Sequence, residues 1–562
     1  MDGKFSDWEG IAFVHNDVVG DVAEGSIDFG GIKITNDLKY IYLYIELNQD
    51  VNLQSSLNTD LYIDTDFDES TGLSIGGIGA ELKWNFAAKT GMFYTDSDSV
   101  SVTQSNVDLF TFPTVSSDTF EIAFGLDVKP DNVNELFPTS QIRFILADID
   151  SGDVAPDFEG GIGYQMEQVI DEMTAPLGIQ KTDSTHLRFL TWNVRRDDLF
   201  NPDLYGEYNR VLNAIKPDII SFQEIYDHNS DEIHDLMETI LPSNAGESWF
   251  TQIDQNDIAL ASRYEITGSW LPNSGNRAFL VNLSPTYVKD ILIIGAHPPC
   301  CANDAERQNE MDGIMAFLRD ARLRNGEVQL EENTPVILAG DLNLVGDKRQ
   351  LETLLTGNIL DNSTWGTDFN PDWDNSALAD AIPVHTNLTH TFTWQNENSP
   401  FSPGRLDYII YTDSVLKMEK TFVLRTEEMK SDTLSLYGLM LDDTRFASDH
   451  LPVVADFSLE LASVTEVIDS PLNRPGSFIL NQNYPNPFNP FTTMEFELQQ
   501  SGFTNLAVYN IQGQKVATLI QGYINKGIHS VTWNAAGSAS GVYFSILTSG
   551  EQTEIRKMLL LK

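Results

Sequence analysis

Hydrophobic and polar residues follow three different patterns along the chain. From residue 1 to about residue 170 the chain contains short strand-like runs: aromatic and aliphatic residues alternate over 40–47, and further short alternating runs cover 120–126 and 141–147. Alternation with a period of two predicts strands, and helical periodicity is scarce in this part. We therefore predict that residues 1–170 form an N-terminal β-sandwich.

Between residues 186 and 460 the apolar runs lengthen and helical stretches separate them. The runs of strand length cover residues 187–191, 219–222, 291–296, 335–339 and 406–411. Helical periodicity covers residues 207–215 and 306–324. Strands dominated by Ile, Leu and Val are typical of sheets that are covered on both faces. This pattern predicts a central α/β domain over residues 186–460.

The third pattern consists of short strand-like runs separated by turns that contain glycine. It covers residues 478–562 and predicts a small C-terminal β-sandwich. Two polar segments with Pro and Gly, at about 171–185 and 461–482, predict linkers between the three domains. A multidomain chain also agrees with the length of 562 residues, because one hydrophobic core rarely extends beyond about 250–300 residues.

Charge and cysteine content exclude several classes of protein. The formal net charge is −49, and such a negative surface repels nucleic acid unless cations or a basic patch intervene. The two cysteines, Cys300 and Cys301, are adjacent, so they cannot build a disulfide framework or a four-cysteine zinc site. Neither a membrane-spanning apolar run nor an apolar signal core after Met1 is evident. We therefore expect any export signal to be absent from this sequence.

Six short motifs in the central domain carry candidate chemistry. They are TWNVR at 191–195, SFQE at 221–224, GAHPP at 295–299, GDLN at 340–343, RLDYII at 405–410 and SDHLPV at 448–453. Phosphoester hydrolysis needs a hard cation held by oxygen ligands, and Glu224, Asn193 and Asp449 are of this kind. His450 is a suitable base because the ordinary pKa of histidine lies near neutrality.

The order and spacing of these motifs closely resemble the endonuclease/exonuclease/phosphatase superfamily, which includes deoxyribonuclease I, inositol phosphatases and neutral sphingomyelinases. The resemblance implies a four-layered α/β sandwich, with two β-sheets flanked by helices. It implies a divalent metal, Mg²⁺ or Mn²⁺/Ca²⁺, with Glu224 as principal ligand and Asn193 and Asp449 completing the shell. It also implies that Asp407 orients His450 as the general base.

The same resemblance assigns roles to three further residues of the motifs. His297 corresponds to the second histidine of the family, which donates to a phosphate oxygen or assists the leaving group. Asn343 is expected to donate to a phosphoryl oxygen, and Asp341 either protonates the leaving group or activates the nucleophile. Asp257 is the nearest candidate for an acidic partner of His297. The adjacent cysteines lie outside the family pattern, and a vicinal disulfide and two free thiols both remain open.

The N-terminal part contains a separate acidic turn, DTDFDESTG at 64–72. Asp64, Asp66 and Asp68 stand at alternate positions and can offer oxygens to Ca²⁺, although a solvated turn has the same composition. The alternating strands of residues 1–170 resemble carbohydrate-binding or DOMON-like sandwiches. That resemblance implies a glycan or a cell surface as partner.

The C-terminal part contains NQNYPNPFNPFTTMEFEL followed by VYNIQGQKV and GVYFSIL. These segments closely resemble the C-terminal sorting domain of the type IX secretion system. The resemblance implies the type IX secretion machinery as partner, and a secreted or cell-surface location.

The sequence thus predicts a secreted, metal-dependent phosphodiesterase that acts on small or lipid-linked phosphoesters. A secreted nuclease remains an alternative, although acidic residues outnumber basic ones in 186–460 and disfavour a long polyanion. The sequence is also compatible with a phosphomonoesterase, a phosphotriesterase or a non-catalytic surface protein that binds glycans.

Overall fold

The computed structural model describes residues 1–562 except 96, 169–177, 245, 255–256, 428, 463–477, 499, 511–513 and 550–551. The chain forms two compact units, Met1–Leu461 and Ala462–Lys562, and each is described by itself. The predicted linkers at 171–185 and 461–482 fall partly outside the described residues. Within the described ranges, no helix is long and apolar enough to cross a membrane.

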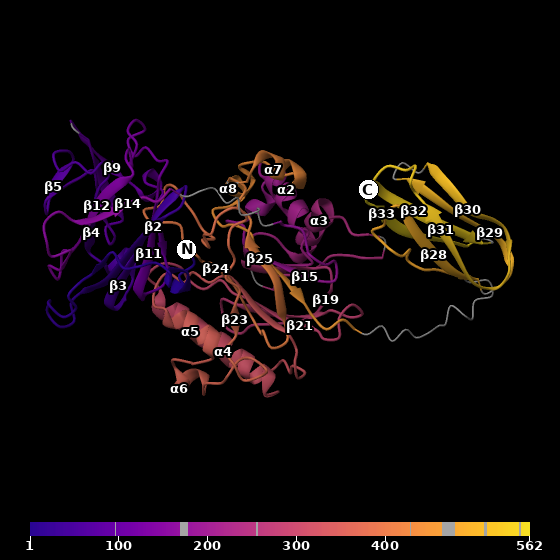
Figure 1. The fold of residues 1–562 in the computed structure, drawn as a ribbon. Coiled ribbons are helices and arrows are strands. Elements are labelled where there is room, and N and C mark those ends of the chain that lie inside the picture. The colour runs from indigo at the N-terminus through magenta and orange to yellow at the C-terminus, as the bar shows by residue number, and fades with distance from the viewer. Residues whose placement is uncertain are drawn as a thin grey trace. The chain divides into compact units, whose positions relative to one another are not determined.

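The N-terminal β region, residues 1–168, consists of two antiparallel sheets that share one core (Figure 1). The first sheet has the order β1-β2-β3-β11-β10, with strands His15–Asn16, Phe29–Asn36, Tyr40–Val51, Ser117–Gly125 and Phe110–Phe112. The second has the order β13-β12-β4-β7-β8-β9, with strands Val154–Ala155, Gln141–Asp148, Thr59–Asp64, Leu82–Asn85, Thr90–Tyr94 and Ser99–Val102, and β14 (Ile162–Gln165) beside β12. Short elements complete this region, namely η1 (Phe5–Trp8), α1 (Leu53–Ser56), β5 (Leu73–Ile75), β6 (Ile78–Ala80) and η2 (Gln104–Asn106).

The two faces of strand β3 pack into different cores, which explains why its aromatic and aliphatic residues alternate. Leu43 and Ile45 point into the core between the two N-terminal sheets. Tyr40 points the other way and packs with Phe110 and Phe392 in a core of the residues that follow. Both faces of this strand are therefore buried, and the N-terminal β region and the central region, residues 178–461, pack into one unit.

The central region contains two six-stranded sheets. One has the order β17-β18-β16-β15-β26-β25, with strands Phe250–Gln252, Asp257–Ser262, Ile219–Ile225, Leu187–Asn193, Val453–Ser458 and Lys417–Val423. The other has the order β19-β20-β21-β22-β24-β23, with strands Glu265–Trp270, Arg277–Asn282, Ile291–Gly295, Val336–Asp341, Asp407–Tyr411 and Ala379–Asp380. Only β15–β16 and β21–β22 run parallel among the strand pairs of the described residues.

Successive residues of the central strands enter different cores, which is why these runs are continuously apolar. In β15, Phe189 packs in the core shared by both sheets, whereas Leu190 packs on the opposite face against α2 (Tyr205–Ile215) and α3 (Ser230–Ile240). In β21, Ile293 enters the shared core, and Ile294 packs against α4 (Asp304–Arg322).

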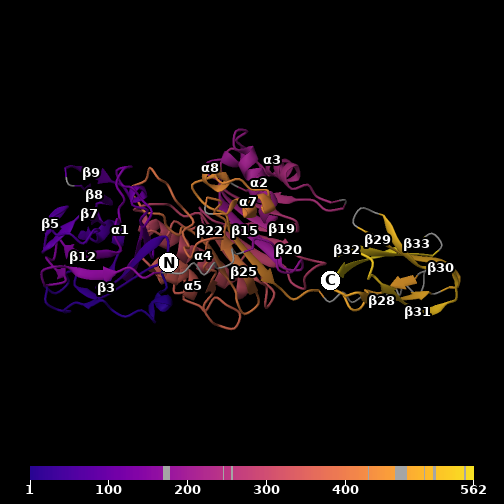
Figure 2. The same ribbon diagram turned by 45° about the horizontal axis from the view of Figure 1, so that its top comes forward.

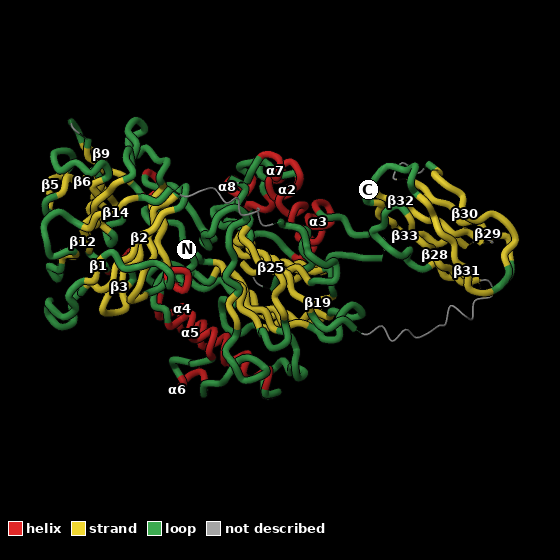
Figure 3. The backbone as a smooth tube through the Cα atoms, in the orientation of Figure 1, coloured by secondary structure: helices red, strands yellow, loops and turns green. Residues whose placement is uncertain are grey.

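The remaining short helices are η3 (Asp198–Phe200), α5 (Arg349–Thr356), α6 (Asn362–Trp365), α7 (Ser431–Tyr437) and α8 (Asp443–Ala447). Figure 3 shows α2, α3, α7 and α8 on one side of the central strands and α4, α5 and α6 on the other, and Figure 2 shows the same region turned. Few helices thus accompany many strands.

The C-terminal unit contains two antiparallel sheets around a single core that includes Trp533 and Leu547. Its strands, β27 to β33, are Phe478–Leu480, Phe491–Leu498, Gly502–Asn510, Lys515–Ile524, Gly527–Asn534, Gly541–Ser549 and Gln552–Leu560. They pair in the orders β27-β28-β31 and β30-β29-β32-β33. The prediction of a chain built mostly from several β-sheets is confirmed.

Candidate active site

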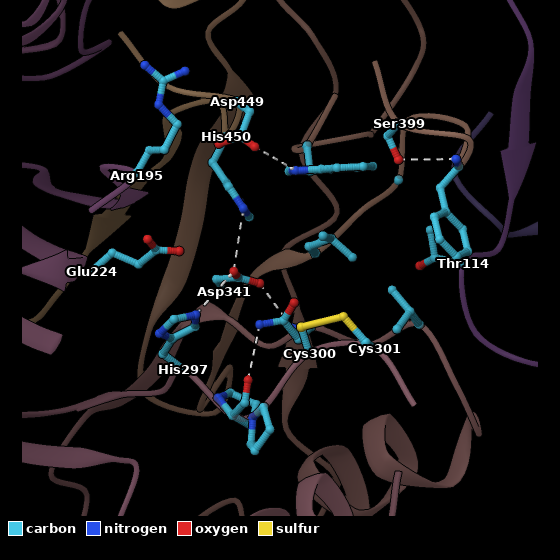
Figure 4. A pocket seen from close by; sticks show the side chains of 18 of the residues that line it. Thr114, Arg195, Glu224, His297, Cys300, Cys301, Asp341, Ser399, Asp449 and His450 are labelled. Atoms are coloured by element: carbon cyan, nitrogen blue, oxygen red, sulfur yellow. Dashed lines mark hydrogen bonds and ion pairs between the residues drawn. A yellow bond between two sulfur atoms is a disulfide. The ribbon is translucent and has the colours of Figure 1, made fainter. Parts of the chain in front are cut away.

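The residues of the six motifs meet at one edge of the two central sheets. Because β15 runs parallel to β16 and β21 runs parallel to β22, the carboxyl ends of each pair lie at the same edge. Six of the eight predicted site residues line a pocket of about 880 Å³, namely Glu224, His297, Asp341, Asn343, Asp449 and His450 (Figure 4). Asn193 and Asp407 are fully buried and hydrogen-bond to members of this set.

Glu224 is aimed by an irregularity in its strand. The pairing of β16 with β18 shifts register between Phe222 and Ile225, and Glu224 adopts φ 66°. Such a bulge redirects a side chain that regular pairing would place elsewhere. Glu224 Oε1 accepts a hydrogen bond from Asn193 Nδ2 at 3.0 Å, and Oε2 accepts one from the Arg196 amide at 2.9 Å. The carboxylate is thus fixed at the pocket surface.

Three carboxylates and two imidazoles form a continuous chain across the site. Asp257 Oδ1 lies 2.8 Å from His297 Nδ1, and Asp407 Oδ2 lies 2.8 Å from His450 Nδ1. Asp341 stands between the two rings, with Oδ2 3.6 Å from His297 Nε2 and 3.5 Å from His450 Nε2. Each ring is therefore oriented by one carboxylate and faces a shared third carboxylate.

These charges control the protonation of the two histidines. Burial lowers the pKa of His297, but its hydrogen bond to Asp257 and the surrounding carboxylates outweigh burial and raise the pKa to about 9. Burial also lowers the pKa of His450, and the charges of Asp407 and Asp341 raise it to about 10. Burial raises the pKa of Asp341, which the positive charge of His450 opposes. In the metal-free protein the carboxylates therefore favour the imidazolium form of both rings.

Contacts with neighbouring loops hold the other two pocket-lining motif residues, Asp449 and Asn343. Trp394 Nε1 donates to Asp449 Oδ2 at 3.2 Å. Asn343 adopts φ 49°, and its side-chain amide donates to the Pro298 carbonyl at 3.1 Å. Its backbone amide donates to Asp341 Oδ1 at 3.0 Å, so Asn343 and Asp341 are coupled within one turn.

Acidic and histidine groups of this site could bind a metal. One ligand atom each of Asp341, Asp407 and His450 lies within 4.8 Å of the others. Glu224 and Asp449, the predicted ligands, line the same pocket, and Asn193 touches Glu224. A set of carboxylate and amide oxygens suits Mg²⁺, Mn²⁺ or Ca²⁺ rather than metals that prefer sulfur. The residues present therefore fit a hard divalent cation.

In the acidic turn of the N-terminal β region, two of the three predicted aspartates lie beside a glutamate from another strand. Asp64 and Asp66 lie together with Glu81, with ligand atoms within 4.8 Å, and this set does not include Asp68. Arg143 pairs with Asp64, and burial raises the pKa of Glu81 to about 7. Asp68 is exposed and accepts from the Ser70 amide. Calcium binding at this turn stays a proposal.

The sequence made Asp257 only the nearest candidate for an acidic partner of His297, and it did not indicate several other residues that line the pocket. Asp257 is distant from His297 in sequence, yet both its oxygens lie within 3.0 Å of His297 Nδ1. Arg195, Arg196 and Trp394 also line the pocket. Cys300 and Cys301, whose state the sequence left open, form a vicinal disulfide at the pocket wall (Figure 4).

Comparison with known families agrees with this geometry. Residues 190–450 match the Endonuclease/Exonuclease/phosphatase family, and residues 482–561 match the Secretion system C-terminal sorting domain. The chain therefore contains a region that matches the endonuclease/exonuclease/phosphatase family, whose members generally hydrolyse phosphoester bonds. It also carries a type IX sorting domain, which indicates a secreted or cell-surface protein.

Several solved structures are similar to about half of the chain. The human Nocturnin catalytic domain with bound sulfate has a TM-score of 0.32 and 16% identity, over 49% of this chain and 95% of that one. Sphingomyelinase C from Streptomyces griseocarneus has a TM-score of 0.26 and 16% identity, over 48% and 99%. A beta toxin variant from Staphylococcus aureus with bound magnesium ions has a TM-score of 0.27 and 15% identity, over 48% and 99%. No curated protein matches the chain.

Proposed function

We propose that the protein is a secreted, divalent-metal-dependent phosphodiesterase that hydrolyses small or lipid-linked phosphoesters by attack of water. The observation that carries this proposal is the chain of Asp257, His297, Asp341, His450 and Asp407 in one pocket with Glu224. This arrangement supplies groups that accept and donate protons beside oxygen ligands for a cation, which is what water-mediated cleavage of a phosphodiester needs.

Glu224, Asn193 and Asp449 would hold the metal. A bound divalent cation neutralises negative charge that develops on the phosphoryl group. Glu224 is the principal ligand in this proposal because two hydrogen bonds, from Asn193 and from the Arg196 amide, fix both of its oxygens. Asp449 is oriented by Trp394 in the same way.

His450 would take a proton from the attacking water. Asp407 accepts from Nδ1 of His450, so Nε2 is the nitrogen that faces the pocket residue Asp341. A carboxylate at Nδ1 holds the ring in the tautomer whose Nε2 is free to accept a proton, and it stabilises the imidazolium that results. His450 acts as a base only in its neutral form, and a cation held by Glu224 and Asp449 would favour that form by offsetting the carboxylate charges.

The second histidine would serve the phosphate or the leaving group. His297 is paired with Asp257 in the same way as His450 with Asp407, and its raised pKa makes it a donor near neutral pH. Asp341 Oδ2 faces both rings, so it can exchange a proton with either one or hold both in place. Asn343, whose amide has two donor hydrogens, would use the one not bonded to Pro298 on a phosphoryl oxygen.

The fold and the secretion signal complete the proposal. The two central sheets would form the inner layers of a four-layered sandwich, which is supported by the shared core between them and by the helices on their outer faces. Residues 482–561 would direct export through the type IX machinery.

The test is hydrolysis of bis(4-nitrophenyl) phosphate by the full chain with Mg²⁺, Mn²⁺ or Ca²⁺, and with a chelator. We expect turnover that depends on the metal. Glu224→Ala should shift the metal concentration for half-maximal rate upward and lower kcat, because it removes a charged ligand. The control is Glu419→Ala, since Glu419 is also partly buried but lies outside the pocket.

Two outcomes would contradict the proposal. One is an absence of hydrolysis with every metal by a wild-type protein that remains folded. The other is an unchanged metal dependence in Glu224→Ala, which would place the cation elsewhere. A rate of hydrolysis that a chelator does not lower would also contradict the proposed metal dependence.

A further inference from the structure

The two sides of the active-site pocket differ in charge. Glu224, Arg195 and His297 lie on one side in Figure 4, and Thr114, Ser399 and Cys301 lie on the other. We call the second side the uncharged wall and define it as the pocket-lining residues within 52–54, 113–114, 298–301, 345 and 394–406. Among the described residues of this wall, none has an ionisable acidic or basic side chain.

The uncharged wall has a largely apolar surface. Leu53, Pro113, Val345, Phe401 and Leu406 contribute hydrocarbon, and the Cys300–Cys301 disulfide contributes sulfur. Phe401 is 43% exposed, so much of its ring remains free to be covered by a ligand. A pocket with a few polar groups at one end and apolar side chains at the other is typical of sites for small organic ligands.

Part of this wall comes from the N-terminal β region, and it is held firmly against the central region. Asn52 Nδ2 donates to the Val345 carbonyl at 2.6 Å, and the Ser402 amide donates to Gln54 Oε1 at 2.9 Å. Thr114 Oγ1 donates to the Arg405 carbonyl at 3.2 Å. A wall fixed by such contacts is already formed before a ligand binds, which reduces the entropy lost on binding.

The distribution of cations limits which substrates this pocket accepts. A nucleic-acid strand has one phosphate per nucleotide, and proteins that hold such strands neutralise the flanking phosphates with Lys and Arg. Arg195 and Arg196 are the only Lys or Arg residues among the described lining residues, and both belong to the loop beside Glu224. Lys89 lies 4.8 Å from the Phe401 ring centroid, but its ammonium donates to the Gln54 and Ala87 carbonyls and does not line the pocket. The described lining residues of the uncharged wall therefore provide no cation for a second phosphate.

From these contacts we infer that the uncharged wall binds an apolar, uncharged substituent of the substrate phosphoester, about as large as an aromatic ring. The inference rests on the proposed function for the position of the phosphate beside Glu224 and the two histidines. It adds the substrate class, a phosphoester with a single phosphate and an apolar organic group, and it assigns Phe401 and Thr114 as specificity-determining residues. The pocket volume of about 880 Å³ accommodates a ligand of this size.

The test compares the binding of phenylphosphonate and methylphosphonate to the full chain with Mg²⁺ by isothermal titration calorimetry. The two probes present the same phosphoryl group and differ in the apolar substituent. We expect phenylphosphonate to bind the wild type at least about tenfold more tightly, and Phe401→Ala to reduce this ratio below about threefold. Thr114→Asp, which adds a charge to the wall, should reduce it as well.

The matched control is Phe13→Ala. Phe13 is also 43% exposed and also lies beneath a lysine, Lys33, as Phe401 lies beneath Lys89, but Phe13 is outside the pocket. It should leave the ratio at its wild-type value. Equal affinity of both probes for the wild type, undetectable binding of both, or a full ratio in Phe401→Ala would each overturn the inference.

Hydrolysis of bis(4-nitrophenyl) phosphate by the same proteins separates the two proposals. A wild type that discriminates between the phosphonates but cleaves no phosphodiester would refute the proposed reaction and uphold the uncharged wall. A wild type that cleaves the diester but binds both phosphonates equally would uphold the proposed reaction and refute the role of the uncharged wall.

Discussion

The Asp407–His450 pair allows a quantitative test of the proposed general base. Asp407→Asn preserves shape but replaces the acceptor at Nδ1 with an amide that can also donate. When the amide donates to Nδ1, it favours the tautomer whose Nε2 already carries a proton and cannot accept another. Asp407 is fully buried and its Oδ2 lies 2.8 Å from His450 Nδ1, so solvent screening of this bond is small.

The magnitude follows from this single bond. A hydrogen bond to a charged group contributes about 1.5–3 kcal/mol. If this contribution is made in the transition state, its loss lowers kcat by about 10- to 150-fold, since each 1.36 kcal/mol is a factor of ten. His450→Ala removes the base itself and should lower kcat by on the order of a hundredfold or more.

The assay is the steady-state rate on bis(4-nitrophenyl) phosphate at saturating metal for the wild type, the two single variants and the double variant. Because the residues act as one unit, the double variant should be little slower than the slower single variant. Asp372→Asn removes another fully buried carboxylate outside the pocket and controls for a general loss of packing. Fully additive losses in the cycle, or near-normal kcat in His450→Ala at every pH, would refute the assignment of the base.

Three further predictions concern other parts of the chain. Burial holds the pKa of His390 well below its ordinary value, so the unfolded state takes up a proton first and the free energy of unfolding should fall as pH drops below about 6.5. His390→Leu should flatten this dependence by up to about 1.4 kcal/mol per pH unit in urea titrations, and an unchanged slope would contradict the reasoning. Added Ca²⁺ should raise the melting temperature of the wild type but not of Asp66→Ala, and identical responses would remove calcium from the acidic turn. A chain that ends at Leu461 should remain folded and active because the first compact unit ends there, and an insoluble or inactive product would show otherwise.

Local sequence patterns were sufficient to predict the strands, but not the contacts between segments that are distant in sequence. The continuous apolar runs 187–191 and 291–296 predicted buried central strands because successive side chains enter cores on opposite faces. The alternating run 40–47 correctly predicted a strand, but it did not indicate that Tyr40 packs against the central region. Contact with a distant segment has no local signal, so the alternation alone could not indicate it.

The same difference between local patterns and long-range contacts applies to the candidate site. The six motifs were recognisable because each places a polar residue at the end of an apolar run. Asp257, by contrast, lies on β18 of one central sheet, and His297 follows β21 of the other, so the packing of the two sheets brings them together. The lining by Thr114 depends on the docking of two regions that are far apart in sequence. Glu81, which joins Asp64 and Asp66 through the fold, was likewise outside the linear motif.

Two regions of the chain line the pocket, and this has a consequence for how the substrate preference of the protein can change. The groups assigned to bond cleavage come from the central sheets, whereas residues 52–54 and 113–114 come from the N-terminal β region. Sequence changes in those two short segments can therefore alter which ester is preferred while the proton-transfer geometry stays intact. Deletion of the N-terminal β region would conversely leave every motif in place and still open the pocket, with Tyr40's partner surface exposed. If the uncharged wall sets substrate preference, part of that preference is encoded outside the region of the catalytic motifs, so residues 52–54 and 113–114 are targets for directed evolution together with Phe401 of the central region.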